Sequence, residues 1–382
     1  MAARRDVALL IETSRSYGRA LLRGVKRFAA ESDSWSVFAD LRSLDSPPPP
    51  WLGDWDGDGV LTRTGNAAMS RAVRRLRMPH VELRSARHNP DAPFVGVDNA
   101  ALVRGVVTHF LDRGFRNFGV YALRSEDYFA ERSDRFVREL SDRGFACEVL
   151  QQGRRERPAE WASQQRRLAE WVRSLPTPCG VLACTDRLGF WLLDACRRAG
   201  VGVPQEVAVV GVENDETLCD LADPPLSSVP LGGEAVGHRA AGVLSRLMSG
   251  RAAPKRSILL PPPPVVERRS SCTVAVEDPD AAAVLRLIRD RATGGLCVGD
   301  LVAATGVSRS RIERLLKEAV GRTPGSEIAR VRLEAARRLL RETDLSVAEV
   351  ASRSGFPHPQ HFSEAFKKAE GVPPGRWRRV RP

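Results

Sequence analysis

The chain has 382 residues, 42% of them hydrophobic and 28% charged, and a formal net charge of +12. This length allows two or three domains, each with its own hydrophobic core. No apolar run approaches the length of a membrane span, and the run near the N-terminus ends too soon for a signal peptide. The seven cysteines form no Cys-x-x-Cys pair. We therefore expect mostly buried thiols in a reducing cytoplasm, and no metal site.

The positive charge is concentrated towards the C-terminus. Residues 280–382 hold 20 Lys and Arg against 12 Asp and Glu, whereas the first 279 residues hold 39 against 35. A basic region of this kind is attracted to a phosphate backbone. An arginine-rich genome would produce a similar excess, so the charge alone does not identify a nucleic-acid-binding protein.

The segment from residue 7 to about residue 258 alternates between short apolar runs and helical patterns. Strands are expected at 7–11, 59–61, 80–83, 94–97, 118–121, 180–184, 207–212 and 258–260. Helices are expected at 18–30, 67–77, 99–113, 128–143, 159–175, 187–199 and 234–249. This alternation predicts an α/β domain at 1–271, with parallel sheets flanked by helices. Its length favours two lobes, one at about 1–120 and 232–258 and the other at about 122–229 and 262–270.

Ligands of such folds bind beyond the carboxyl ends of the strands, so the polar residues directly after each strand are binding-site candidates. The proline run at 261–264 cannot lie inside a central strand, and we expect it to cross between lobes or to begin an edge strand. Residues 272–279 are expected to link this domain to a separate all-α domain at 280–382. Asp278 or Asp280 is positioned to cap its first helix.

The last hundred residues contain one helical pattern twice, about 49 residues apart. Each copy consists of a short amphipathic helix, a turn centred on Gly306 or Gly355, and a second amphipathic helix. Helices are expected at 281–292, 298–305, 308–320, 325–342, 346–354 and 359–370. The pattern predicts two helix-turn-helix units whose second helices lie in the DNA major groove. A generic helical bundle is the alternative, but chance rarely repeats so many positions at one spacing.

This repeat resembles the C-terminal signature of the AraC/XylS family. The resemblance rests on residues 346–351, 355–356, 361–363, 366–368, 371 and 373–374. It implies two helix-turn-helix units that enter successive major-groove segments on one face of the DNA, about 34 Å apart.

The resemblance also indicates which side chains face DNA. The candidates in the first unit are Ser310, Arg311, Glu313 and Arg314. The candidates in the second unit are Gln360, His361 and Glu364 for bases, and Lys367, Lys368 and 376–379 for phosphates. Arginine can bond guanine through two hydrogen bonds, and glutamate can accept from cytosine. For any single charged residue, a solvated helix face is the alternative.

Residues 7–270 resemble the sugar-sensing core of LacI/GalR regulators and periplasmic sugar-binding proteins. The segments that carry this resemblance are 97–100, 132–136, 183–187, 200–204, 209–215 and 225–229, in the family order. A sugar presents hydroxyl groups that both donate and accept, so its site needs carboxylates, amides and a planar arginine. The resemblance therefore implies a monosaccharide effector bound between two lobes.

By position, the resemblance assigns sugar contacts first to Arg132, Asp186 and Glu213. The further candidates are Thr185, Asn214, Asp98, Ser14 and the aromatic Tyr17, with Tyr128 and Trp191 as other possible platforms. Asp98 and Asp186 can alternatively cap the helices that follow them. Arg132 can alternatively pair with Asp127 or Glu131. Glu213 and Thr185 stand where such cores commonly have Asp and Asn. Both differences change the shape of the pocket, so the identity of the sugar stays open.

A LacI-like sensor followed by an AraC-like tail resembles the group of xylose operon regulators over essentially the whole chain. It implies a sugar-responsive transcription activator that dimerises through the sensor. The implied partners are double-stranded promoter DNA, a monosaccharide effector, RNA polymerase and a second copy of the chain, with no membrane, cofactor, metal or catalytic residue.

An enzyme that carries a DNA-binding tail is the alternative. The sequence lacks a G-x-G-x-x-G after the first strand, a P-loop and a G-x-S-x-G motif, which argues against it. An architectural DNA protein that senses no ligand is a third possibility, but it would leave the large N-terminal domain without a role.

Overall fold

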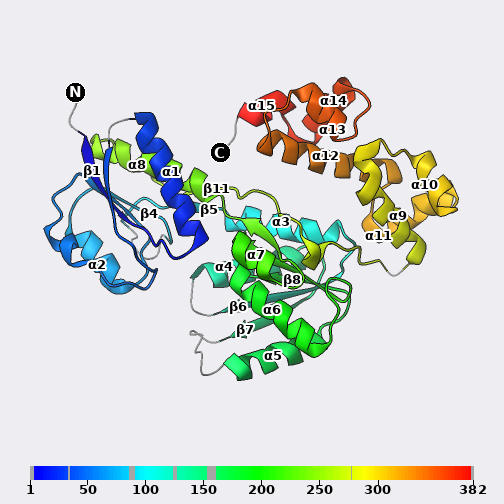
Figure 1. Ribbon diagram of the computed structural model, residues 1–382, viewed down its shortest axis with the longest axis horizontal. Helices are drawn as coiled ribbons and strands as arrows, with labels where there is room; N and C mark the ends of the chain where they lie inside the picture. The colour runs from blue at the N-terminus through cyan, green and yellow to red at the C-terminus, as the bar shows by residue number, and fades with distance from the viewer. Residues whose placement is uncertain are drawn as a thin grey trace. The chain divides into compact units, whose positions relative to one another are not determined.

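A computed structural model describes residues 4–32, 35–85, 91–123, 127–152, 161–276 and 278–379. The chain forms two compact units (Figure 1). The first consists of Met1–Thr108 with Asn117–Cys272, and the second of His109–Arg116 with Thr273–Pro382. The main division lies beside the boundary expected at residue 271. The inclusion of 109–116 in the second unit is not foreseen by the sequence pattern.

The first unit contains two parallel sheets, as the alternation of apolar runs and helices predicts. One sheet has the strand order β2-β1-β3-β4, and the short pair β11-β5 continues it through a bridge between Glu82 and Phe94. Its strands are β1 (Arg5–Leu10), β2 (Trp35–Ala39), β3 (Gly59–Thr62), β4 (His80–Glu82), β5 (Val95–Val97) and β11 (Ile258–Leu260).

The other sheet has five strands in the order β10-β9-β8-β6-β7. They are β6 (Asn117–Leu123), β7 (Cys147–Gln152), β8 (Cys179–Ala183), β9 (Val207–Glu213) and β10 (Ser227–Pro230). The central strands β8 and β9 are buried along almost their whole length, which is typical of parallel strands covered on both faces. The proline run at 261–264 joins β11 to Val266, which bridges Ser228 of β10. It therefore crosses from one sheet to the other, as expected.

Helices cover both sheets. They are α1 (Ser16–Ser32), α2 (Ala67–Arg75), α3 (Asn99–Leu111), α4 (Asp127–Ser141), α5 (Trp161–Ser174), α6 (Asp186–Ala199), α7 (Glu216–Leu221) and α8 (Gly233–Met248). Helices α1 and α8 pack closely because each contributes a glycine at the contact. A Cβ atom on Gly24 would lie 2.0 Å from the carbonyl oxygen of Glu234, and one on Gly237 would lie 2.1 Å from that of Leu21. Any larger residue at either position would force the two helices apart.

The second unit is all-helical apart from its connections. Its helices are α9 (Pro279–Arg291), α10 (Val298–Thr305), α11 (Arg309–Val320), α12 (Pro324–Glu342), α13 (Val347–Arg353), α14 (Pro359–Glu370) and α15 (Pro374–Arg379). One apolar core includes Leu301, Ile312 and Leu316, and a separate core includes Val350 and Phe362. Each helix-turn-helix unit thus has its own core, and α12 joins them. This confirms the predicted fold of an α/β domain followed by paired helix-turn-helix units.

Some elements were missed by the sequence pattern, namely β2, β7, β10, α7 and α15. The three strands all lie at sheet edges, where they do not need the continuous apolar run of a central strand. Within the expected linker, Val274 and Val276 pack against the first helix-turn-helix core. Within the described ranges, no helix has the length and apolar character of a membrane span.

Candidate effector site and DNA interface

The loops after β1 and β3 bring a carboxylate and a guanidinium together inside the first unit. Glu12 is 1% exposed and Arg63 is 8% exposed. Arg63 Nη1 forms an ion pair with Glu12 Oε1, and the guanidinium lies 5.1 Å from the centroid of the Tyr17 ring. Burial acts to lower the pKa of Arg63, but Glu12 together with Tyr128, Tyr17 and Glu213 outweighs it, and the pKa is raised. The pairing compensates the desolvation of both charges.

Arg132 on α4 is a second buried guanidinium. Its Nε donates to Oδ1 of Asn99 at 3.0 Å, and its Nη1 donates to the backbone oxygen of Cys184 at 2.8 Å. The guanidinium also lies 5.1 Å from the ring centroid of Tyr128. Glu131, which the sequence offered as an ion-pair partner, instead pairs with Arg135 at 2.9 Å. Arg132 is therefore held in place by neutral acceptors from two other segments.

Two carboxylates complete the cluster from the second sheet. Asp186 is fully buried, and its Oδ2 accepts from the backbone N–H of Asp215 at 2.7 Å while Oδ1 accepts from the hydroxyl of Ser228. Burial, together with the neighbouring carboxylate of Glu213, raises the pKa of Asp186 to about 8. Burial also raises the pKa of Glu213, although Arg15 and Arg132 oppose the shift. The backbone of Glu213 has a φ of 115°, a strained conformation of the kind found at binding sites.

Side chains from both sheets interact at this place. Glu213, at the end of β9, interacts electrostatically with Arg15 and Arg63 from the loops of the first sheet. Arg15 in turn interacts electrostatically with Tyr128 at the start of α4. We call the following residues the effector cluster: Glu12, Arg15, Tyr17, Arg63, Tyr128, Arg132, Asp186 and Glu213. Most of them follow carboxyl ends of strands, where ligands of parallel α/β folds bind.

Four other predicted contact residues have local roles or lie apart. Asp98 accepts from two backbone N–H groups in the first turn of α3, each at 2.9 Å, and so caps that helix. Thr185 caps α6 in the same way at 3.3 Å. The Oδ1 of Asn214 accepts from Arg268 at 2.9 Å, and Ser14 is exposed. Asp98 thus has the capping role that the sequence left open.

The sequence reasoning did not select Glu12, Arg15, Arg63 or Asn99. The available signal was their position directly after β1, β3 and β5, where polar residues of this fold face the ligand. Arg63 was the hardest to find, because Thr-Arg-Thr after a strand is also an ordinary surface loop. Its burial depends on Glu12, which is 51 residues away in the sequence.

The second helix of each helix-turn-helix unit presents its polar face outward. On α11, Ile312, Leu315 and Leu316 are buried. The predicted DNA contacts on that helix are all exposed, and they are Ser310, Arg311, Glu313 and Arg314. Arg311 pairs with Asp280 at 2.6 Å and Glu313 with Arg309 at 3.1 Å. These exposed pairs contribute little to stability.

The second helix-turn-helix unit repeats this arrangement. Phe362 and Phe366 of α14 are buried in its core, with ring centroids 5.5 Å apart. The predicted contacts Gln360, His361, Glu364, Lys367 and Lys368 are all exposed. Ser346 and Glu349 form a reciprocal capping box that fixes the start of α13, the first helix of this helix-turn-helix unit. No group of His, Cys, Asp or Glu with metal-binding geometry occurs among the described residues.

Comparison with known proteins agrees with this architecture. Residues 107–271 match the periplasmic binding protein-like domain, and residues 301–380 match the helix-turn-helix domain. The chain is 32% identical to the xylose operon regulatory protein of Escherichia coli K12, over 99% of this chain and 97% of the relative. The chain belongs to the family of xylose operon regulatory proteins. It is therefore a DNA-binding transcription regulator with a sensor of the periplasmic-binding-protein type.

Other members of the family match over a similar extent. The xylose operon regulatory protein of Haemophilus influenzae is 28% identical over 97% of each chain. The solved structure of a xylose-binding transcription activator superposes with a TM-score of 0.65 at 31% identity, covering 99% of each chain. The order of sensor and reader domains is therefore common to these xylose operon regulatory proteins.

Asp186 makes the stability of the protein depend on pH. Its pKa is about 8 when folded against an ordinary value of 3.8, so between these values the unfolded state has lost a proton that the folded state retains. Rising pH therefore favours unfolding through this group. We expect the melting temperature of the wild type to fall relative to that of Asp186→Asn between about pH 5 and about pH 9.

Scanning calorimetry of both proteins at each pH measures this difference. Asp194→Asn on the same helix, where the acid pairs with Arg197 and Arg198, is the control and should follow the wild-type pH profile. Parallel profiles for wild type and Asp186→Asn would contradict the assignment.

Proposed function

We propose that this transcription regulator responds to a monosaccharide that binds at the effector cluster. The supporting observation is a set of buried polar atoms without hydrogen-bond partners among the described residues, namely Glu12 Oε2, Arg63 Nε and Ser16 Oγ. Each such atom costs about 1–3 kcal/mol when it stays unpaired. The hydroxyl groups of a sugar can donate to the carboxylate and accept from the guanidinium.

The composition of the cluster favours a neutral polyol over an anion. Arg63 is already paired with Glu12, and Arg15 and Arg132 are both opposed by the nearby carboxylate of Glu213. Net positive charge is therefore small where the ligand would lie. The aromatic rings of Tyr17 and Tyr128 supply apolar surface for the C–H face of a sugar ring. We propose a pentose of the xylose type as the effector, because the relatives are named for xylose.

Arg132 provides the test of the sugar proposal. Arg132→Gln removes the charge that orients Asn99 and borders the ligand, and we expect sugar affinity to fall at least about 30-fold, corresponding to loss of a charged hydrogen bond. Isothermal titration calorimetry with a panel of pentoses and hexoses measures the affinity. Arg135→Gln, one turn away on the exposed face of the same helix, should leave affinity unchanged. Absence of heat with every sugar, together with unchanged DNA affinity, would refute a sugar effector.

We further propose that α11 and α14 read bases, with Ser310, Glu313, Arg314, Gln360, His361 and Glu364 as the base-contacting candidates. The proposal is supported by their exposure on the face opposite each apolar core. Lys367 and Lys368, in the last turn of α14, are better placed for phosphates than for bases because they are adjacent cations at a helix end. We also propose that Arg311 contacts DNA, and that its ion pair with Asp280 breaks when DNA binds.

The two kinds of contact predict different responses. Arg314→Ala should weaken binding to the selected operator by about 1–3 kcal/mol and relax preference at one base pair. Lys368→Ala should weaken binding to all sequences alike and reduce the salt dependence by about one phosphate contact. Selection from random duplexes followed by fluorescence anisotropy at several salt concentrations measures both. Arg338→Ala on the joining helix is the control, and equal effects of all three variants on every sequence would count against the assignment.

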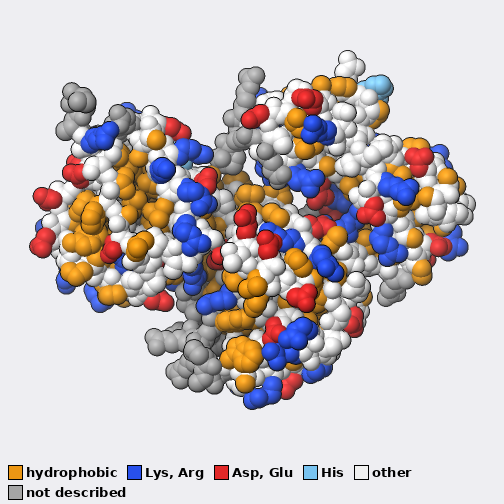
Figure 2. Space-filling model, viewed as in Figure 1, with side chains coloured by type: hydrophobic (Ala, Val, Ile, Leu, Met, Phe, Trp, Pro, Cys, Tyr) orange, Lys and Arg blue, Asp and Glu red, His pale blue; other side chains and the backbone are white. Residues whose placement is uncertain are grey.

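We propose that the regulator acts as a homodimer through the first lobe of the sensor. Strand β2 lies at the edge of its sheet, with Val37 43% and Phe38 45% exposed. The Phe38 ring contacts those of Trp51 and Trp55, with centroid distances of 4.8 Å and 5.9 Å. Hydrophobic side chains gather on the lobe that contains β1 and α2 (Figure 2). An exposed apolar patch on an unpaired edge strand is typical of an interface.

A pair of matched variants tests the dimer. Val37→Lys places a charge on the edge strand β2, and we expect the dimer dissociation constant to rise at least about tenfold, which corresponds to 1.4 kcal/mol. Val149→Lys changes the same residue type at 47% exposure on β7, the edge of the other sheet, and should not alter assembly. Sedimentation velocity measures both. A dimer that survives Val37→Lys, or that is lost equally in both variants, would exclude this surface.

We place the protein in the cytoplasm, where promoter DNA is available, and propose that it activates transcription. The support is that the solved relative with 31% identity is a xylose-binding transcription activator. Activation makes RNA polymerase the third partner, besides operator DNA and sugar.

A further inference from the structure

Helix α3 contributes to both compact units. Its first ten residues belong to the sensor unit, whereas residues 109–111 and the turn to Arg116 belong to the second unit. Its first residue, Asn99, bonds the effector-cluster arginine Arg132 at 3.0 Å and Glu131 at 2.8 Å. One end of the helix is thus held by the proposed sugar site.

The body of α3 has the packing of a rigid element. Leu102, Val103, Val106, Val107 and Phe110 are each at most 1% exposed. Close-packed cores of this kind do not deform continuously, so a shift at one end moves the whole helix. A 13-residue helix of this type extends about 20 Å.

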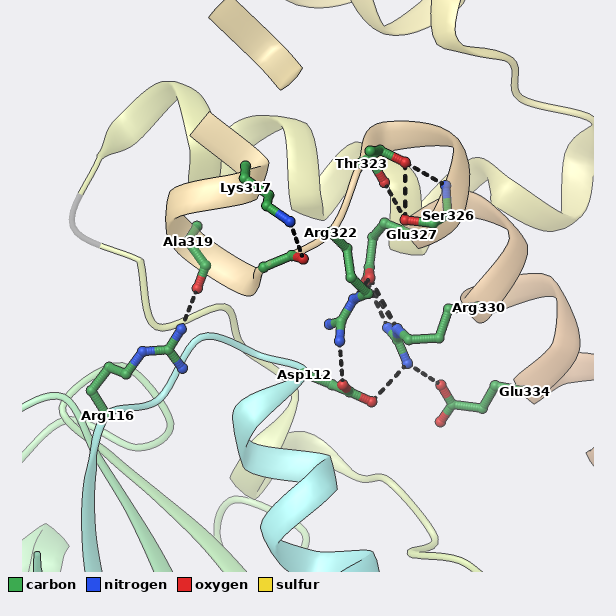
Figure 3. A network of polar contacts seen from close by, with 11 residues as sticks. Asp112, Arg116, Lys317, Ala319, Arg322, Thr323, Ser326, Glu327, Arg330 and Glu334 are labelled. Carbon is green, nitrogen blue, oxygen red and sulfur yellow. Dashed lines mark hydrogen bonds and ion pairs between the residues drawn. The ribbon is translucent and has the colours of Figure 1, made fainter. Parts of the chain in front are cut away.

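The other end of α3 is held by an ionic network within the second unit (Figure 3). Asp112 Oδ1 accepts from Arg322 Nη1 at 2.9 Å, and Oδ2 accepts from Arg330 Nη1 at 3.3 Å. Both arginines also bond the carboxylate of Glu327, at 2.6 Å and 2.8 Å. Arg330 bonds Glu334 at 3.1 Å as well. Arg322 lies in the turn between α11 and α12, and the other partners lie in the first three turns of α12.

Backbone contacts hold the turn after Asp112 against the segment that precedes α9. The carbonyl oxygen of Arg113 accepts from the N–H of Ala275 at 2.7 Å. Gly114 has a φ of 85°, and a Cβ atom there would lie 2.7 Å from Val276, so only glycine fits. Arg116 Nη2 donates to the carbonyl oxygen of Ala319 at 2.8 Å, in the last turn of α11 (Figure 3). The segment therefore touches both the end of the reading helix α11 and the helix that follows it.

The network would keep the second unit folded without Asp112. Burial acts to raise the pKa of Glu327, but Arg330 and Arg322 outweigh it and the pKa is lowered. Glu327 is 1% exposed and would retain both arginines after loss of Asp112. Glu327 thus has a structural role, whereas Asp112 specifically connects α3 to this network.

We propose that helix α3 is the element that couples the effector site to the first helix-turn-helix unit, and that Asp112 is its attachment residue. The proposal rests on the proposed sugar-responsive function. Ligand binding that changes the Arg132–Asn99 contact would bias the position of α3, and the Asp112 network would pass this bias to α11 and α12. Such coupling is a free energy shared by two sites and is therefore reciprocal.

A double-mutant cycle on DNA affinity tests the coupling without any choice of sugar. Arg132→Gln perturbs one end of α3, Asp112→Asn the other, and fluorescence anisotropy with the selected operator gives dissociation constants for both single variants, the double variant and the wild type. We expect the effect of Arg132→Gln to change at least about threefold when Asp112 is replaced, because contacting or coupled sites are not additive. Additive effects would overturn the proposal.

The control background is Glu370→Gln. Glu370 pairs with Arg337 at 2.6 Å, and its side chain is 19% exposed, close to the 14% of Asp112. It lies on α14, outside the α3 segment, so the effect of Arg132→Gln should stay unchanged in this background. Equal non-additivity with Glu370→Gln would indicate general destabilisation and would also overturn the proposal.

A second variant and a second readout make the result independent of folding. Arg116→Gln removes the contact to Ala319 from an exposed side chain, and it should likewise be non-additive with Arg132→Gln. Thermal melts verify that each protein is folded.

A second readout uses D-xylose as the probe. Wild type and Asp112→Asn should bind the sugar within about twofold of each other. The xylose-induced change in DNA affinity should shrink at least about fivefold in the variant, the lower end of typical allosteric coupling. A full xylose response in Asp112→Asn would refute α3 coupling, whereas failure of the wild type to bind any sugar would refute the effector proposal and leave the cycle to decide the coupling.

Discussion

Two buried guanidinium groups impose the main constraint on the sensor. Removing a charge from water costs several kcal/mol unless partners replace the lost hydration. Arg63 meets this requirement with the carboxylate of Glu12, whereas Arg132 is held by Asn99 and a backbone oxygen. The loops after β1, β3 and β5 must therefore keep fixed positions around the two arginines. In the proposed function, this fixed arrangement lets the site distinguish a small polar ligand by its hydroxyl pattern.

The carboxylates of the second sheet respond to the same burial. Asp186 is a mainly neutral acid near neutral pH, because its pKa is raised to about 8. A neutral carboxylic acid can donate one hydrogen bond, and Glu213 beside it can accept when ionised. The site thus offers both kinds of hydrogen-bonding group without a large net charge. A strained backbone at Glu213 holds its side chain at the end of β9.

In the second compact unit, the residues that form the cores differ from those proposed to contact DNA. Each helix-turn-helix core is made of buried aliphatic and aromatic side chains, and the polar residues of α11 and α14 lie on the opposite faces. Base preference can therefore change by surface substitution without loss of the cores. The exception is the network of Asp112, Arg322, Glu327 and Arg330, in which charged groups are part of the packing. In the proposed coupling, Glu327 and the two arginines stabilise the fold, whereas Asp112 connects this packing to helix α3.

The central strands, the helices and the repeated helix-turn-helix pattern follow from the residue pattern alone, because buried elements must repeat apolar residues at their own period. The same pattern predicts the polar faces of α11 and α14. Tertiary contacts determine whether a polar residue after a strand caps a helix, as Asp98 does, or is buried with a partner, as Arg63 is with Glu12. The edge strands β2, β7 and β10 and the assignment of 109–116 to the second unit are likewise determined by tertiary contacts. Each depends on contacts between residues far apart in the chain, and local periodicity carries no information about such contacts.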